Sequence, residues 1–94
     1  MNVIWGAGMY KNRNGERNNI AGVAIRKLRL GQKPFMSQRA LSAKLQLEGI
    51  DLDKNAIQRI EAGNRFITDI ELLAFAKAFN VEIAAFFDDA TSDD

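Results

Sequence analysis

Helix caps and helix stops divide most of this chain into short helical segments. Ser37 and Asp53 are residue types that accept hydrogen bonds from the free N–H groups of a helix N-terminus. Thr68 is followed three positions later by Glu71, which together form a capping box. Each segment then ends at a residue that favours helix termination, namely Gly31, Gly49, Gly63 or Asn80. These caps and stops restrict the chain to short helices, and the sequence has no strand pattern or internal repeat that would indicate another fold.

The apolar spacing within the segments predicts a compact all-α bundle of four to five short helices. The expected helices cover residues 19–30, with Asn18 or Asn19 as the cap, and then 38–48, 54–62, 69–79 and 83–87. The helix over 69–79 has the strongest apolar pattern, because Ile70, Leu73 and Ala74 widen an already continuous stripe. We therefore expect that helix to be buried on most sides.

The 94 residues are expected to form one domain over residues 19–88. Residues 1–18 mix glycine, asparagine and scattered charge, which predicts a flexible leader. Its basic residues Lys11, Arg13 and Arg17 fit either a DNA-contacting arm or simple disorder. Residues 89–94 are expected to be an acidic, disordered tail.

The composition excludes several classes of protein. The chain has no cysteine and no histidine, so disulfides, thiolate zinc sites and Ser-His-Asp or cysteine-based catalysis are excluded. We expect no metal, no cofactor and no enzymatic activity. No apolar run approaches the roughly 20 residues that span a bilayer, and no charged segment precedes the apolar start. These features predict a cytoplasmic protein.

Charge is distributed unevenly along the chain. Residues 1–47 contain nine Lys and Arg but only one acid, whereas residues 48–94 contain four basic and eleven acidic residues. This asymmetry fits a surface for a polyanion, although a solvated surface without a partner explains it equally well.

The helix over 54–62 has two chemically different faces. Ile57 and Ile60 point inward, whereas the outward side carries Lys54, Asn55, Gln58 and Arg59. Lys and Arg pair with guanine in the major groove, and Asn and Gln pair with adenine. The same side chains also fit an ordinary solvated helix surface, so the pattern alone leaves both interpretations open.

Three segments together resemble the lambda-repressor-like helix-turn-helix family, also called the Cro or XRE type. They are MSQRALSAKL (36–45), NAIQRIEAGNR (55–65) and LLAFAKAFNVEIAAFF (72–87), and the resemblance covers about residues 20–87. It implies a helix-turn-helix protein that binds double-stranded DNA, with Lys54, Asn55 and Arg59 at base edges and Gln58 at base or phosphate. It also implies backbone phosphate contacts from Ser37, Gln38, Arg39, Asn64 and Arg65.

The resemblance implies two further features. Arg29 matches a family arginine that pairs with the glutamate at Glu61, so we expect a partly buried ion pair. At least one of Phe86 and Phe87 is expected to close the core. Because the region around the last helix often forms the dimer interface in this family, these two residues are also candidates for a homodimer contact.

The sequence departs from the family pattern at several points. The turn between the second and third helices, residues 46–51, is longer than usual, and Leu47 and Ile50 are expected to pack as an extra turn. The preceding link has about two additional residues at Lys33–Pro34. Glu82 is a weak cap for the last helix.

The favoured interpretation is a sequence-specific transcriptional regulator, a repressor that acts as a homodimer. The alternative is a protein-interaction module similar to antitoxins or anti-repressors, with the partner bound by the acidic half. A continuous positive strip of Arg39, Lys54, Arg59 and Arg65 would favour DNA. Interruption of that strip by Glu48 and Asp51 would favour the protein partner.

Overall fold

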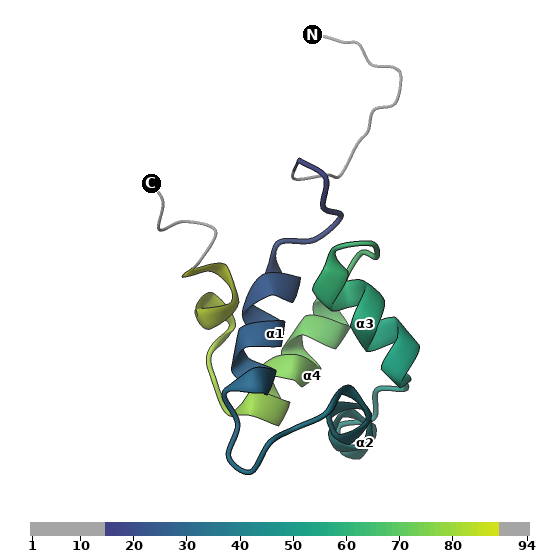
Figure 1. The fold of residues 1–94 in the computed structure, drawn as a ribbon, viewed down its shortest axis with the longest axis vertical. Coiled ribbons are helices and arrows are strands. Elements are labelled where there is room, and N and C mark those ends of the chain that lie inside the picture. The colour runs from purple at the N-terminus through teal and green to yellow at the C-terminus, as the bar shows by residue number, and fades with distance from the viewer. Residues whose placement is uncertain (1–14, 89–94) are drawn as a thin grey trace, which may run out of the picture.

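The computed structural model describes residues 15–88. They form an all-helical fold whose elements are α1 (Ala21–Leu30), α2 (Gln38–Leu47), α3 (Lys54–Ala62), α4 (Asp69–Phe79) and the short 3-10 helix η1 (Ile83–Phe87). In Figure 1, α1 and α4 lie side by side, α3 forms one edge of the molecule and η1 the other, and α2 is seen end-on beneath α3. The predicted all-α class is confirmed, and no described helix is long and apolar enough to cross a membrane.

The predicted caps are confirmed by hydrogen bonds at three helix starts. The Ser37 hydroxyl accepts from the Ala40 N–H at 3.0 Å, and the Asp53 carboxylate accepts from the Ala56 N–H at 2.8 Å. Thr68 and Glu71 complete the reciprocal capping box of α4. Each cap satisfies N–H groups that have no partner within the helix, which fixes where these helices begin.

Asn19 performs the same function for α1. The helix proper starts at Ala21, and the Asn19 side-chain oxygen accepts from the Gly22 N–H at 2.8 Å. At the other end of the fold, η1 is a 3-10 helix without a side-chain cap. The poor capping ability of Glu82 is consistent with this short, tighter form.

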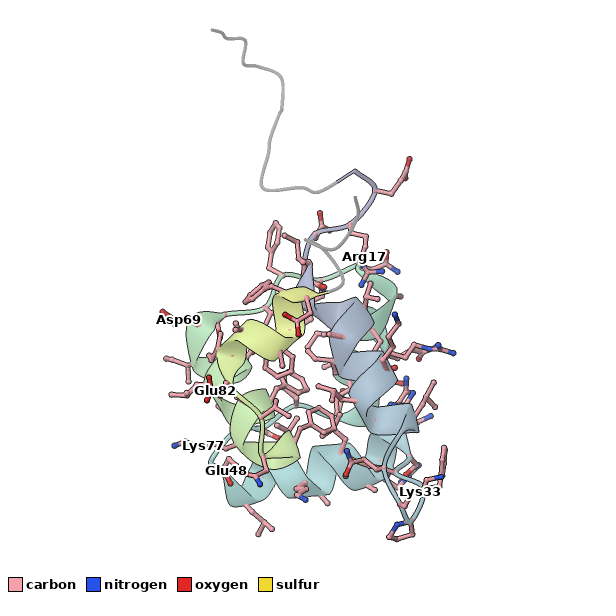
Figure 2. The ribbon with its side chains drawn as sticks, turned by 90° about the vertical axis from the view of Figure 1, so that its left-hand side faces the viewer. Arg17, Lys33, Glu48, Asp69, Lys77 and Glu82 are labelled. Atoms are coloured by element: carbon pink, nitrogen blue, oxygen red, sulfur yellow. The ribbon has the colours of Figure 1, made fainter. Side chains whose placement is uncertain are left out.

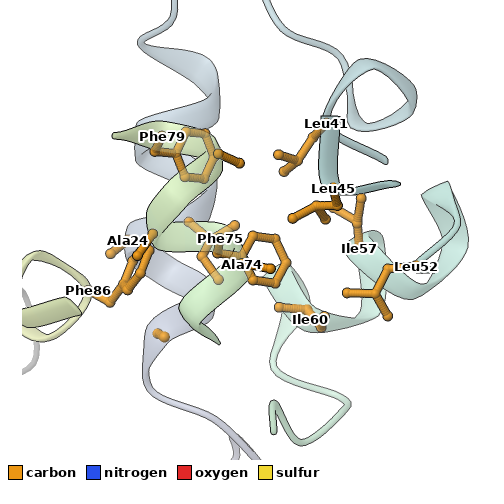
Figure 3. Packing of buried hydrophobic residues seen from close by; sticks show 14 of the residues in the cluster. Ala24, Leu41, Leu45, Leu52, Ile57, Ile60, Ala74, Phe75, Phe79 and Phe86 are labelled. Carbon is orange, nitrogen blue, oxygen red and sulfur yellow. The ribbon is translucent and has the colours of Figure 1, made fainter. Parts of the chain in front are cut away.

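The core forms where all five helices meet. Phe75 of α4 lies at its centre, and Phe86 of η1 packs beside Ala24 of α1 (Figure 3). Burying each such large side chain stabilises the fold by about 1.5–3 kcal/mol. The side chains that are almost completely buried are Phe75, Phe86, Ile25, Leu41, Leu45, Ile57 and Ile60.

Two expectations about packing are wrong. The α4 helix is not buried on most sides, because Ile70 and Leu73 are 68% and 49% exposed. Leu47 does not pack as part of an extra turn, since it is 85% exposed. Of the three residues that widen the apolar stripe, Ala74 is buried, whereas Ile70 and Leu73 remain on the surface.

The long turn between α2 and α3 is anchored by Leu52 instead. Gly49 adopts a left-handed conformation with φ of 82°, and the Ile50 N–H donates to the Leu45 carbonyl. The chain then extends and inserts Leu52, which is 5% exposed, into the core. The Ser42 hydroxyl donates to the Leu52 carbonyl at 2.6 Å. These contacts hold the start of α3 in place despite the length of the turn.

The ordered domain starts before the predicted boundary at residue 19. The Asn18 N–H donates to the Gly63 carbonyl at 2.8 Å, and Arg17 donates to the Glu61 carbonyl at 2.9 Å. Arg17 therefore belongs to the domain and is not part of a free basic arm. The other two arm residues, Lys11 and Arg13, and the predicted tail over 89–94 lie outside the described residues.

Candidate nucleic-acid interface

The outward face of α3 consists of polar side chains without partners. Lys54, Asn55, Gln58 and Arg59 are all exposed, and none of them pairs with another described residue. Figure 1 shows α3 at the edge of the molecule, with the other helices on its inner side. That inner side is apolar and is formed by the buried residues Ala56, Ile57 and Ile60. The predicted division of the helix into two faces is therefore present.

A buried ion pair fixes α3 against α1. The Arg29 guanidinium donates to both carboxylate oxygens of Glu61, at 2.7 and 2.9 Å, and each residue is 6% exposed. Arg29 also donates to the Met36 carbonyl at 3.0 Å. This is the pair that the sequence predicts. Because both charges are desolvated, the pair depends on this complete set of hydrogen bonds.

Gln38 links the same carboxylate to the start of α2. Its side-chain amide donates to Glu61 at 3.0 Å, so α1, α2 and α3 meet at one group. Ser37 and Arg39 lie exposed on either side of it at this end of α2. Gln38 therefore braces α3 against the start of α2, and one amide hydrogen remains for another acceptor.

Arg65 is less available than the sequence suggests. Its guanidinium donates to both oxygens of Glu71, at 2.9 and 3.0 Å, and to the Phe66 carbonyl at 2.8 Å. The hydrogen bond from Arg65 lowers the pKa of the Glu71 carboxyl, and burial partly opposes this effect. The same hydrogen bond raises the pKa of Arg65. A phosphate contact from Arg65 would have to compete with Glu71, whereas Asn64 is exposed.

Acidic residues border one end of this surface. Asp53 precedes α3 and is used as its cap, but Asp51 is exposed and has no partner among the described residues. Glu48 follows the opposite end of α2 from Arg39, and a helix of 10 residues is about 15 Å long. In Figure 2, Glu48 lies on the side that carries Lys77 and Glu82. Of the two acids expected to interrupt a basic strip, Asp51 is therefore the relevant one.

Arg17 and Asn19 support the other end of α3, which the sequence does not predict. Asn19 donates to the carbonyls of Ile60 and Arg65, at 2.9 and 2.7 Å, and Arg17 donates to Glu61. The Ile60 and Glu61 carbonyls are among those that a helix C-terminus leaves without a helical partner, and the Arg65 carbonyl lies in the loop that follows α3. The sequence indicates this support only through Asn19, and there it predicts no more than a cap for α1.

One of the two residues predicted to form a dimer contact is buried. Phe86 is 1% exposed and belongs to the core, while Phe87 is partly buried. A short helix that packs against both α1 and α4 turns its first aromatic inward. Phe86 is therefore the aromatic residue that closes the core and is not available for a dimer contact, whereas a contact through Phe87 stays a prediction.

Comparisons of the chain with protein-family models, with curated proteins and with solved structures found no match. Within residues 15–88, no group of three or more acidic side chains is arranged to hold a metal ion.

Proposed function

We propose that the protein is a cytoplasmic regulator that binds double-stranded DNA, with α2 and α3 acting as a helix-turn-helix pair. The observation that carries the proposal is the exposed set Lys54, Asn55, Gln58 and Arg59 on α3, which has no partners among residues 15–88. Side chains of these types have hydrogen-bond donors and acceptors that complement those of the base edges in the major groove. A helix held at both ends by buried and backbone contacts presents them without further folding.

The phosphate contacts would come from the residues around this helix. Ser37, Gln38 and Arg39 lie at the N-terminal end of α2, where free N–H groups favour an anion. Asn64 and, in competition with Glu71, Arg65 follow α3. Such contacts position the protein, whereas the side chains on α3 specify the sequence. A homodimer bound at a promoter would then repress transcription.

A protein partner is the second candidate, as in antitoxins or anti-repressors. It is favoured by the exposed carboxylate of Asp51 next to α3 and by the pairing of Arg65 with Glu71, since both reduce the positive charge of the surface. Under this alternative, the acidic half of the chain, around α4 and η1, would bind the protein partner, and DNA binding would be weak and insensitive to sequence.

Selection from a random duplex pool tests the proposal. We expect a short motif to be enriched, and binding measured by fluorescence anisotropy should weaken steeply as salt increases. Arg59→Ala should lower affinity for the motif by about tenfold to a hundredfold and relax selectivity at one position. Arg26→Ala removes an exposed charge from α1 and serves as the matched control. Absence of any enriched motif would reject sequence-specific binding and favour the protein partner.

The carboxylate of Asp51 gives a second prediction. If α3 faces DNA, Asp51 lies close to a phosphate backbone, and Asp51→Asn should raise affinity by about threefold in low salt because a repulsion is removed. Glu82→Gln, on the side with η1, should leave affinity unchanged (Figure 2). An equal gain in DNA affinity from both substitutions would indicate a general charge effect. No gain in affinity from Asp51→Asn would indicate that DNA binds to a surface other than that of α3.

A further inference from the structure

The outward face of α4 exposes two large apolar side chains next to each other. Ile70 and Leu73 are 68% and 49% exposed and are three positions apart, so they are neighbours on the helix surface. The opposite side of the helix supplies Phe75 and Phe79 to the core. No described element of this chain covers the Ile70 and Leu73 pair.

Opposite charges flank this apolar pair. Asp69 begins α4 and Lys77 lies two turns later, and neither has a partner among the described residues. At 100° per residue, Asp69, Ile70, Leu73 and Lys77 fall within an arc of about 100°. Figure 2 shows Asp69 and Lys77 on the same side of the molecule. The face thus has a negative end, an apolar centre and a positive end.

We propose that this α4 face binds a second copy of the chain, with the two α4 helices antiparallel. In a two-fold symmetric interface, residue i contacts residue j and j contacts i. Leu73 lies midway between Asp69 and Lys77, so a two-fold axis at Leu73 brings each Asp69 to the partner's Lys77. The apolar residues of both copies then meet at the centre. The charge pattern is therefore complementary to itself, which is what selects a second copy as the occupant.

The size of the face predicts a weak dimer. An α4 of 11 residues is about 16 Å long, so one helix pair buries less than the ~800 Å² per partner of a standard interface. We expect association in the micromolar range. This inference deepens the proposed function by naming a dimer surface on α4, whereas Phe86 lies in the core. It does not depend on DNA, so its failure can be told apart from failure of DNA binding.

Sedimentation velocity of the full chain without DNA tests the proposal. The unmodified protein should associate reversibly with rising concentration, and Leu73→Glu should weaken the dimer by at least about tenfold, since it places a charge at the centre. Leu30→Glu is the matched control, because Leu30 is exposed on α1. A protein that stays monomeric up to about millimolar concentration, or a Leu73→Glu variant that associates normally, would overturn it.

A charge exchange tests the antiparallel arrangement itself. Asp69→Lys leaves a lysine at both ends of the face, and Lys77→Asp leaves an aspartate at both ends, so each variant should self-associate about threefold to tenfold more weakly. Mixing the two should restore association, because both charge pairs become favourable in the heterodimer. Thermal unfolding of each variant separates loss of folding from loss of contact. Normal self-association of both single variants, or no gain on mixing, would contradict the arrangement.

Discussion

Replacement of Arg29 by methionine is expected to lower the free energy of unfolding by about 3–5 kcal/mol. The substitution removes the guanidinium that donates two hydrogen bonds to Glu61, a residue that is only 6% exposed. Within residues 15–88, the Gln38 amide is then the one side-chain donor left to that carboxylate. Gln38 supplies one neutral hydrogen bond, which does not compensate a buried charge. A loss of this size is a large share of the stability of a small domain.

Urea denaturation followed by circular dichroism measures this loss. Arg26→Met, a substitution at an exposed position of the same helix, should change stability by less than about 0.5 kcal/mol. The double variant Arg29→Met with Glu61→Leu should recover most of the loss, because no unpaired charge remains buried. A loss in Arg29→Met no greater than in the control would show that Glu61 finds water or another donor.

The features that the sequence predicts correctly are those that depend on local chemistry. Ser37, Asp53 and Thr68 accept hydrogen bonds from N–H groups only a few residues away, so a cap is visible in the sequence without knowledge of the fold. The two faces of α3 follow in the same way from helical periodicity. The pairing of Arg29 with Glu61 is different, because 32 residues separate them. That pair was expected only through resemblance to a family.

The features that the sequence does not predict depend on which helix covers which surface. Leu73 and Phe75 are both apolar and lie in the same helix, but the fold buries Phe75 completely and leaves Leu73 49% exposed. Arg65 has the side chain of a typical phosphate ligand. Its hydrogen bonds to Glu71 depend on the conformation of the loop before α4, which the sequence does not show. The sequence places Arg17 in a leader. Its hydrogen-bond partner in α3 is a backbone carbonyl, and a backbone group gives no residue pattern from which the contact can be predicted.

Gly22→Ala is expected to destabilise the fold by about 2–4 kcal/mol, although helix propensity predicts a gain of about 1 kcal/mol for the same change. Gly22 lies in the first turn of α1, where this helix meets the C-terminal end of α3. A Cβ there would fall on the Ile60 carbonyl oxygen and lie 2.7 Å from both the Arg17 guanidinium and the Asn19 side-chain oxygen. Because backbone atoms are involved, α1 would have to move away from α3.

Thermal and urea unfolding of Gly22→Ala and Gly31→Ala separate these two effects. Gly31 ends the same helix with a φ of −85°, and a Cβ there would lie 3.3 Å from its nearest neighbour, the Lys27 carbonyl oxygen, so its change should stay within about 1 kcal/mol. Movement of α1 at Gly22 would also lengthen the Arg17 and Asn19 hydrogen bonds that hold the end of α3. Amide hydrogen exchange in the last turn of α3 should therefore accelerate in Gly22→Ala only. Stabilisation by Gly22→Ala would mean that α1 and α3 are further apart than the structure places them.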